Sequence, residues 1–148
     1  VKEQKPIFVN NTDHGMQMFT RGELWVAPFW DGRARSLQDS QVPVEFVFPD
    51  EGAAPLGFGL ALNQGSNVKE LTEEYINYSL DPEVQIAYSA RTKYPPTNLK
   101  AIEKLPDDLQ RIKIPRAAMD NMLQIDYYGY SKVVDGRLER WNKEVMTA

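Results

Sequence analysis

The chain has 148 residues, and 17 Lys and Arg against 21 Asp and Glu give it a net charge of −4. Hydrophobic residues make up 42% and charged residues 26%, an ordinary globular composition that argues against a disordered tail or a coiled coil. The acidic balance without a basic cluster argues against nucleic acid as a partner, because phosphate neutralisation needs concentrated Lys and Arg.

Residues that commonly bind metals or act as nucleophiles are scarce. The chain has no cysteine, which excludes disulfides, thiolate nucleophiles and Cys-based zinc sites. Its one histidine, His14, cannot form a His cluster by itself, and no GxSxG, Walker A, HExxH or GxGxxG motif is present. We therefore expect no metal, no cofactor and no enzymatic activity. The first residues lack the apolar region of a signal peptide, which predicts an internal or processed start.

The first 62 residues alternate between helical and strand-like patterns. Cap residues and glycine mark the ends of the helices, whereas segments rich in β-branched and aromatic residues fit a pleated, buried surface. We expect a helix from Thr12 or Asp13 until Gly22, a second from Asp31 to about Leu37, and strands at 23–29, 42–48 and 58–62. This order predicts an α/β fold with a partly parallel sheet.

The rest of the chain is predicted to be mainly helical. Asn67–Glu70 resembles a capping box, and Asp81-Pro82 can begin another helix because proline costs nothing at the first helical position. A short helix is expected at 98–105, and Asp126 can cap a last long helix with a break near Gly136. Helical spacing predicts two buried stripes: Val68, Leu71, Tyr75 and Tyr78, and then Tyr127, Tyr130, Val134, Leu138, Trp141 and Val145.

Few polar groups are spaced for catalysis or metal binding. Glu51 lies in a Gly/Pro loop and can act as a general base, but no acid or nucleophile is spaced around it. The pair Asp107-Asp108 follows a proline, which is typical of a solvated helix start. Tyr127 and Tyr128 can supply phenolate ligands to a ferric ion, although helical spacing favours core packing for them.

Aromatic residues stand at the ends of several expected elements. Trp30 follows a strand and precedes a helix, at the carboxyl end where ligands usually bind an α/β sheet. Tyr94 precedes two prolines, and Phe58 begins the third strand after a loop. Taken together these rigid rings suit a small-molecule cleft, whereas each taken singly is more typical of core or rim packing.

An ordered set of short motifs carries a family resemblance. The motifs are GELW (22–25), WDG (30–32), FPDEG (48–52), GSN (65–67), INYSLDPE (76–83), YPPTN (94–98) and RW (140–141). With them the chain, from about Asn11 to Trp141, resembles the C-terminal part of the solute-binding proteins of bacterial ABC importers, of the spermidine/putrescine-binding type.

The resemblance implies a type II periplasmic-binding-protein-like fold. Two α/β lobes, with a mixed sheet and flanking helices, are joined by hinge strands, close on a small ligand without catalysis and deliver it to an ABC permease in the membrane. The implied location is periplasmic or extracytoplasmic. Two other functions stay open: a sensor or enzyme domain that reuses the same lobes, and a ferric-ion-binding protein.

Members of the family are about twice this long, so the chain resembles the C-terminal half of the two-lobe fold. The family layout implies that residues 1–50 belong to the second lobe, that 51–105 return to the first lobe, and that 106–148 form the C-terminal helices. Such a piece lacks strand neighbours and exposes apolar surface. We therefore expect either a missing N-terminal half or self-association.

The family's ligand shell implies a binding site that consists of Trp30, Asp31, Arg33, Glu51, Phe58 and Tyr94. Trp30 matches the aromatic residue that stacks on the ligand's aliphatic chain, and Tyr94 matches another cleft aromatic. Arg33 and Phe58 depart from the pattern, because polyamine binders carry carboxylates there. Without these carboxylates a buried ammonium stays unpaired, whereas Arg33 in the first turn of a helix suits an anion unless it points to solvent. We therefore expect an anionic ligand and not a polyamine.

Overall fold

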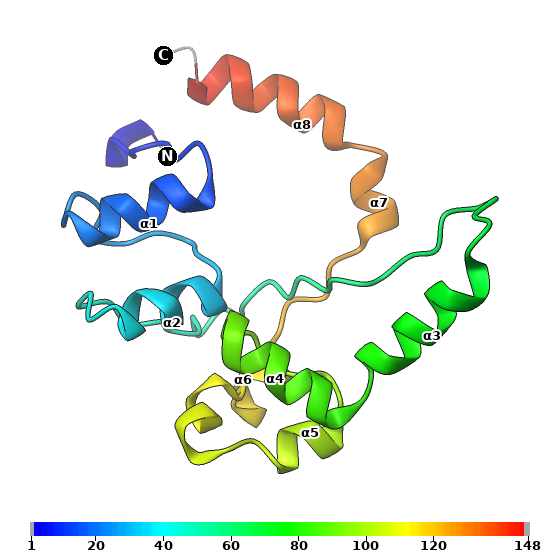
Figure 1. Ribbon diagram of the computed structural model, residues 1–148. Helices are drawn as coiled ribbons and strands as arrows, with labels where there is room; N and C mark the ends of the chain where they lie inside the picture. Colours follow the sequence, from blue (N-terminus) through cyan, green and yellow to red (C-terminus); the bar gives the residue numbers. More distant parts are fainter. Residues whose placement is uncertain (1, 147–148) are drawn as a thin grey trace.

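The computed structural model describes residues 2–146 as short helices joined by long extended segments (Figure 1). In chain order the elements are η1 (Lys2–Gln4), α1 (Thr12–Thr20), α2 (Asp31–Asp39), α3 (Lys69–Ser79), α4 (Pro82–Thr92), α5 (Leu99–Glu103), η2 (Asp107–Ile112), α6 (Arg116–Asp120), α7 (Tyr127–Ser131), α8 (Val134–Trp141) and η3 (Asn142–Met146). Positions 1, 147 and 148 lie outside the described residues. They are the first residue of the expected segment 1–50 and the last two of the expected segment 106–148.

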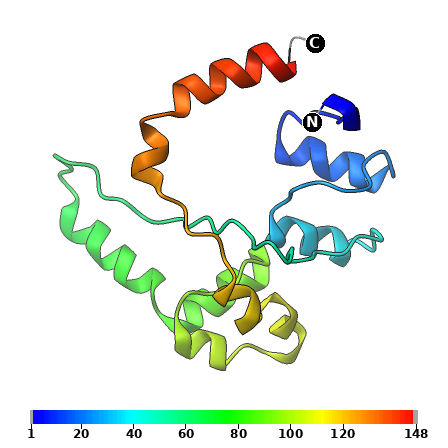
Figure 2. The same cartoon turned by 180° about the vertical axis from the view of Figure 1, so that it is seen from behind.

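The helices surround an extended central segment in an open arrangement. α1 lies beside α2, and α4 packs against α2, α3 and α5, while the far end of α3 projects away from the other helices (Figure 1). α7 and α8 curve back toward the N-terminal segment, as Figure 2 shows from behind. There the rings of Phe8 and Trp141 meet edge to face, with centroids 6.1 Å apart. Within the described residues no helix has the length and apolar character needed to span a membrane.

Side-chain caps explain where several helices begin. The side chain of Asp81 accepts hydrogen bonds from two backbone N–H groups of α4, and Pro82 occupies the first turn, which confirms the predicted start. Asp126 caps α7 as expected, by accepting from the N–H of Gly129. The cap of α1 is Asn11, one residue before the predicted positions.

Two expectations about helix ends are wrong. The predicted capping box does not form, because α3 begins after Val68 without a side-chain cap hydrogen bond. The predicted long last helix is two helices, and it breaks at Lys132 and Val133 instead of near Gly136. Gly136 lies inside α8 in open space, where the missing side chain only lowers helix propensity.

The strands expected at 23–29, 42–48 and 58–62 do not form, and residues 2–146 contain no strand, so the mixed sheet is absent from the described part of the chain. Residues 42–48 still show the strand pattern: alternate residues from Val42 to Phe48 are half-buried and those between them are exposed. A helix satisfies its backbone groups internally, whereas a strand needs a neighbouring segment with which to exchange hydrogen bonds. These segments have no such neighbour among the described residues.

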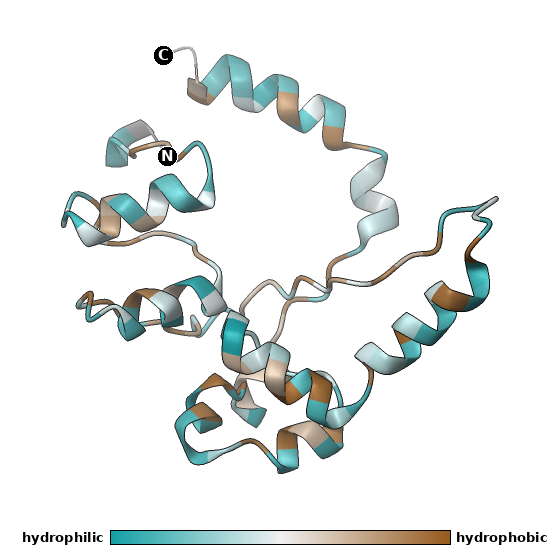
Figure 3. Cartoon of the chain, in the orientation of Figure 1, coloured by the Kyte–Doolittle hydropathy of each residue, from teal (hydrophilic) through white to brown (hydrophobic). Residues whose placement is uncertain are grey.

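The buried apolar core is small. Its best-packed part is Leu105, Leu109 and Ile112, with Ile86 of α4 against them. Both predicted stripes are wrong as buried faces: Val68, Leu71, Tyr75 and Tyr78 are at least half exposed, and Tyr127, Tyr130, Leu138 and Trp141 are exposed too. Figure 3 shows hydrophobic residues on the open faces of α3 and α8. The accessible surface is 11933 Å², compared with about 7,700 Å² for a compact monomer of this mass.

Two extended segments lie against each other at the centre of the molecule. The N–H of Leu123 donates to the carbonyl of Ala53 at 3.0 Å, and the amide of Asn121 donates to the carbonyl of Asp50 at 2.8 Å. Between these bonds Gly52 has a φ of +100°, and a Cβ placed on it would lie 2.3 Å from the Asn121 carbonyl oxygen. Only glycine fits this crossing without strain.

We expect Gly52→Ala to destabilise the protein by about 1–3 kcal/mol, because alanine adds both a positive-φ penalty and a clash with backbone. Gly57→Ala is the matched control, since Gly57 has open space around it. Urea denaturation of both variants checks this expectation. Equal stability of the two variants would contradict the claim that only glycine fits at position 52.

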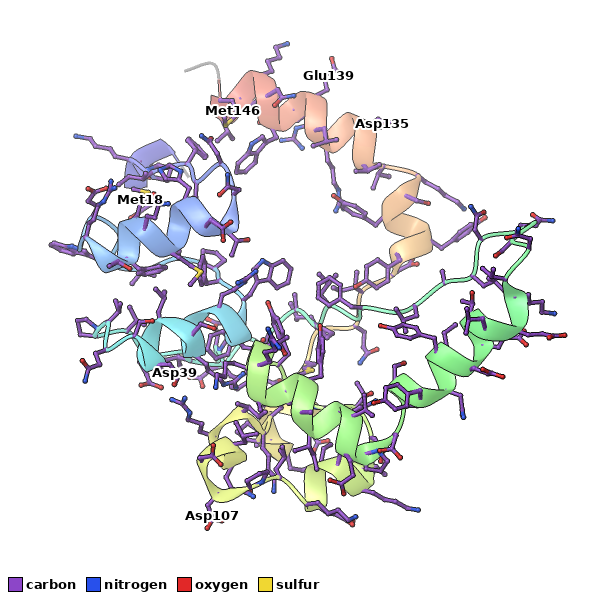
Figure 4. The ribbon with its side chains drawn as sticks, viewed as in Figure 1. Met18, Asp39, Asp107, Asp135, Glu139 and Met146 are labelled. Carbon is purple, nitrogen blue, oxygen red and sulfur yellow. The ribbon has the colours of Figure 1, made fainter. Side chains whose placement is uncertain are left out.

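One carboxylate joins three helical segments outside the apolar core. Asp39 at the end of α2 pairs with Arg111 of η2 and, at 3.2 Å, with Lys93 at the end of α4. Figure 4 labels Asp39 on the side of α2 that faces α4 and η2. The pKa of Asp39 is lowered from its usual 3.8, mainly by the hydrogen bond from Arg111 and also by that from Lys93. Burial acts in the opposite direction.

We expect Asp39→Asn to lower the free energy of unfolding at neutral pH by about 1 kcal/mol or less, because the pair is partly solvated. Since the folded-state pKa is depressed, the stabilisation is present above pH 3.8 and is lost as the pH falls through the folded value. Thermal unfolding of the wild type and of Asp39→Asn, from pH 7 to pH 2, measures this stabilisation. A gap in melting temperature that persists at pH 2 would show that the charge is not its source.

Candidate functional site

Two of the expected aromatic residues meet at the start of α2. Trp30 is the N-cap residue of this helix, and its ring centroid lies 6.3 Å from that of Phe58. Trp30 is 40% exposed and Phe58 is 79% exposed, so the pair offers apolar ring faces to solvent. Both residues keep a surface on which an aliphatic or planar group can stack.

Tyr94 packs on the first turn of the same helix. A Cβ placed on Gly32 would lie 2.7 Å from the Tyr94 ring, so the ring rests directly on the helix backbone. Burial raises the pKa of the Tyr94 phenol, while the nearby Arg33 guanidinium acts in the opposite direction. The phenol is therefore a neutral hydroxyl at physiological pH, able to donate or accept one hydrogen bond.

The beginning of α2 has the features of an anion-binding surface. Trp30 provides no side-chain cap, and the first intrahelical bond is donated by the N–H of Ala34, so the N–H groups before it have no partner among the described residues. Arg33 is exposed in this turn. The Asp31 carboxylate is already engaged, because it pairs with Arg35 at 2.5 Å. The free donors and the Arg33 cation, which lies beside the Tyr94 phenol, together favour a negatively charged group.

Other residues of interest lie apart from this cluster. Glu51 is exposed in the turn before Gly52, and it has no hydrogen bond or ion pair with any described residue. Tyr127 donates its hydroxyl to the carbonyl of Pro55, and Lys132 lies over the exposed ring of Tyr128, so neither tyrosine packs in a core. In the part of the chain that the structure describes, no three His, Asp or Glu side chains group as metal ligands do.

Two surface grooves in the structure do not coincide with the aromatic cluster. One, of about 730 Å³, lies between α3 and α4, with Tyr78 and Asp81 in its wall. The other, of about 650 Å³, lies between α2, the extended segment 42–48 and η2, and Arg35 and Phe46 line it. Trp30, Phe58 and Tyr94, the aromatic wall of the candidate site, line neither of these two grooves.

Sequence reasoning missed Arg35, which the structure places at the centre of this region. Arg35 is 5% exposed, and besides Asp31 it contacts the Lys93 carbonyl at 3.5 Å and the Phe46 ring. The available signal was the spacing of four between Asp31 and Arg35, which brings opposite charges together on a helix. That spacing is usually a solvent-exposed pair, so the burial was not evident.

Known proteins resemble most of the chain. The spermidine/putrescine-binding periplasmic protein 1 of Haemophilus influenzae is 28% identical over 99 residues, which are 67% of this chain and 28% of that protein. The corresponding protein of Salmonella typhimurium is 28% identical over 122 residues, 82% of this chain and 33% of the relative. That of Escherichia coli is 27% identical over 103 residues, 70% of this chain and 30% of the relative. No solved structure gives a significant match.

The family comparison covers more than half of the chain. The chain spans about a third of the length of these curated relatives. A family model described as bacterial extracellular solute-binding protein matches residues 1–114, which include the whole α2 region, Phe58 and Tyr94. Such a family suggests a periplasmic-binding-protein-like fold and an extracytoplasmic location. The chain belongs to the bacterial extracellular solute-binding proteins.

Proposed function

We propose that this protein acts in the substrate-binding component of an ABC importer and holds a small solute against Trp30, Phe58 and Tyr94 without transforming it. Family membership and relatives named as binding proteins support this role. The observation that carries it is the meeting of these rings with Arg33 at the uncapped start of α2. The solute is then handed to a membrane permease.

The proposed ligand carries a carboxylate, phosphonate or similar anion. The named relatives bind spermidine and putrescine, which are cations, and such ligands need carboxylates close to their ammonium groups. Around the rings, the Asp31 carboxylate is held by Arg35, and Glu51 is in a turn with no contact to the cluster. Arg33 and the free N–H groups of α2 suit the opposite charge.

Calorimetric titration with spermidine, succinate and methylphosphonate tests the charge of the ligand. We expect at least one anion to bind, and Arg33→Glu to weaken that binding about tenfold or more, because a hydrogen bond to a charged group contributes about 1.5–3 kcal/mol. Lys100→Glu, the same charge reversal on exposed α5, is the control and should bind as the wild type does. Micromolar or tighter binding of spermidine would contradict the anionic ligand.

We also propose that a further polypeptide segment covers the exposed faces of α3 and α8. Its source is either an N-terminal portion of the same kind of protein or a second copy. The excess surface of the chain over a compact monomer is about 4,000 Å²; covering half of it would bury about 4,000 Å² over both partners, which is the size of an obligate interface. The extended segments without neighbours support the same proposal, since unpaired strand edges invite pairing.

Sedimentation of the purified chain tests this coverage. We expect self-association or aggregation of the chain alone, and recovery of a monodisperse species when a longer polypeptide supplies the missing neighbours. Leu71→Glu on the exposed face of α3 should reduce self-association, whereas Glu70→Gln on the same helix should not. A monodisperse monomer of the chain alone would contradict the proposal.

A further inference from the structure

Arg35 is a buried cation on α2, next to the proposed ligand site. Its guanidinium pairs with the carboxylate of Asp31 at 2.5 Å, and the same nitrogen, Nη1, lies 3.5 Å from the carbonyl oxygen of Lys93. The Phe46 ring covers the guanidinium, with the ring centroid 5.8 Å from it. Burying a guanidinium costs free energy unless its N–H groups find acceptors. Moving the Asp31 carboxylate or the Lys93 carbonyl away from Arg35 is therefore unfavourable.

The two polar partners of Arg35 are sequence neighbours of two aromatic residues of the proposed site. Asp31 directly follows Trp30 at the start of α2, and Lys93 directly precedes Tyr94 at the end of α4. Lys93 has a φ of 65°, a left-handed conformation that costs a non-glycine residue energy. Its carbonyl contact with Arg35 and its ion pair with Asp39 hold this strained turn against α2.

We infer that Arg35 is a positioning residue for the ligand site. It fixes the turn at Lys93 so that the Tyr94 ring rests on Gly32, beside Arg33 and the uncapped start of α2. The inference rests on the proposed function, because Tyr94 is treated as part of the ligand wall. In this arrangement Arg35 acts through its neighbours: it positions Tyr94 by way of Lys93, and it also holds the Asp31 carboxylate.

Titration of the Tyr94 phenol in the ligand-free protein tests the positioning. The absorbance change of each protein on raising the pH is compared with that of the same protein carrying Tyr94→Phe, which isolates Tyr94 from the other tyrosines. We expect Arg35→Met to lower the pKa of Tyr94 toward its ordinary value, because the released ring becomes solvated. Arg111→Met, which breaks the Asp39–Arg111 pair but keeps the Lys93–Asp39 pair and the Arg35 contacts, should leave that titration unchanged.

A second variant separates positioning from loss of the fold. Arg35→Lys keeps a cation beside Asp31 but lacks the guanidinium fork, so it should also free Tyr94 while the far-ultraviolet circular dichroism stays that of the wild type. A wild-type Tyr94 titration in Arg35→Lys would overturn the inference. So would a wild-type titration in Arg35→Met with its helices intact.

Binding of succinate or methylphosphonate separates the inference from the proposed function. If the wild type binds neither probe, the proposal of an anionic ligand is wrong. The phenol titration still decides whether Arg35 positions Tyr94. If a probe binds, we expect Arg35→Lys to weaken it about tenfold through the displaced Tyr94. Unchanged affinity together with a shifted Tyr94 titration would overturn the link between Arg35 and the ligand.

Discussion

The need to satisfy the buried guanidinium of Arg35 constrains the middle of the molecule. Arg35 belongs to α2, but one of its partners is the backbone carbonyl of Lys93 at the end of α4. The two helices are far apart in sequence, and two further contacts join them: the Lys93–Asp39 ion pair and the packing of the Tyr94 ring on Gly32. The aromatic wall exists because these contacts bring the end of α4 to the start of α2.

Local signals in the sequence predicted the helices better than any other feature. Asp81 with Pro82, and Asp126, act within one turn of the chain, so their effect does not depend on distant segments. The segment 42–48 has an equally clear pattern, but a strand is completed by another segment, and none of the described residues supplies one. The buried stripe expected on α3 was wrong for the same reason, since burial requires a partner surface.

The candidate site was predictable where it depends on residue type and not where it depends on contacts between distant segments. Trp30, Phe58 and Tyr94 were recognisable as aromatics at element ends, and the structure brings Trp30 to Phe58 and Tyr94 to Gly32. Glu51 was expected in the same site, but the structure gives it no contact with these rings. Arg35 was missed because a spacing of four predicts a pair without predicting its burial.

The aromatic wall and the uncovered faces of α3 and α8 have one physical consequence for binding. Arg33 is exposed, and a charge in water interacts with an anion by only about 1 kcal/mol at 4 Å. A second wall that excludes water from Trp30, Phe58 and Arg33 would strengthen this attraction severalfold and would bury the rings around the ligand. On the proposed function, ligand affinity depends on the segment proposed to cover this apolar surface, because that segment would also determine how strongly the cation at the start of α2 acts.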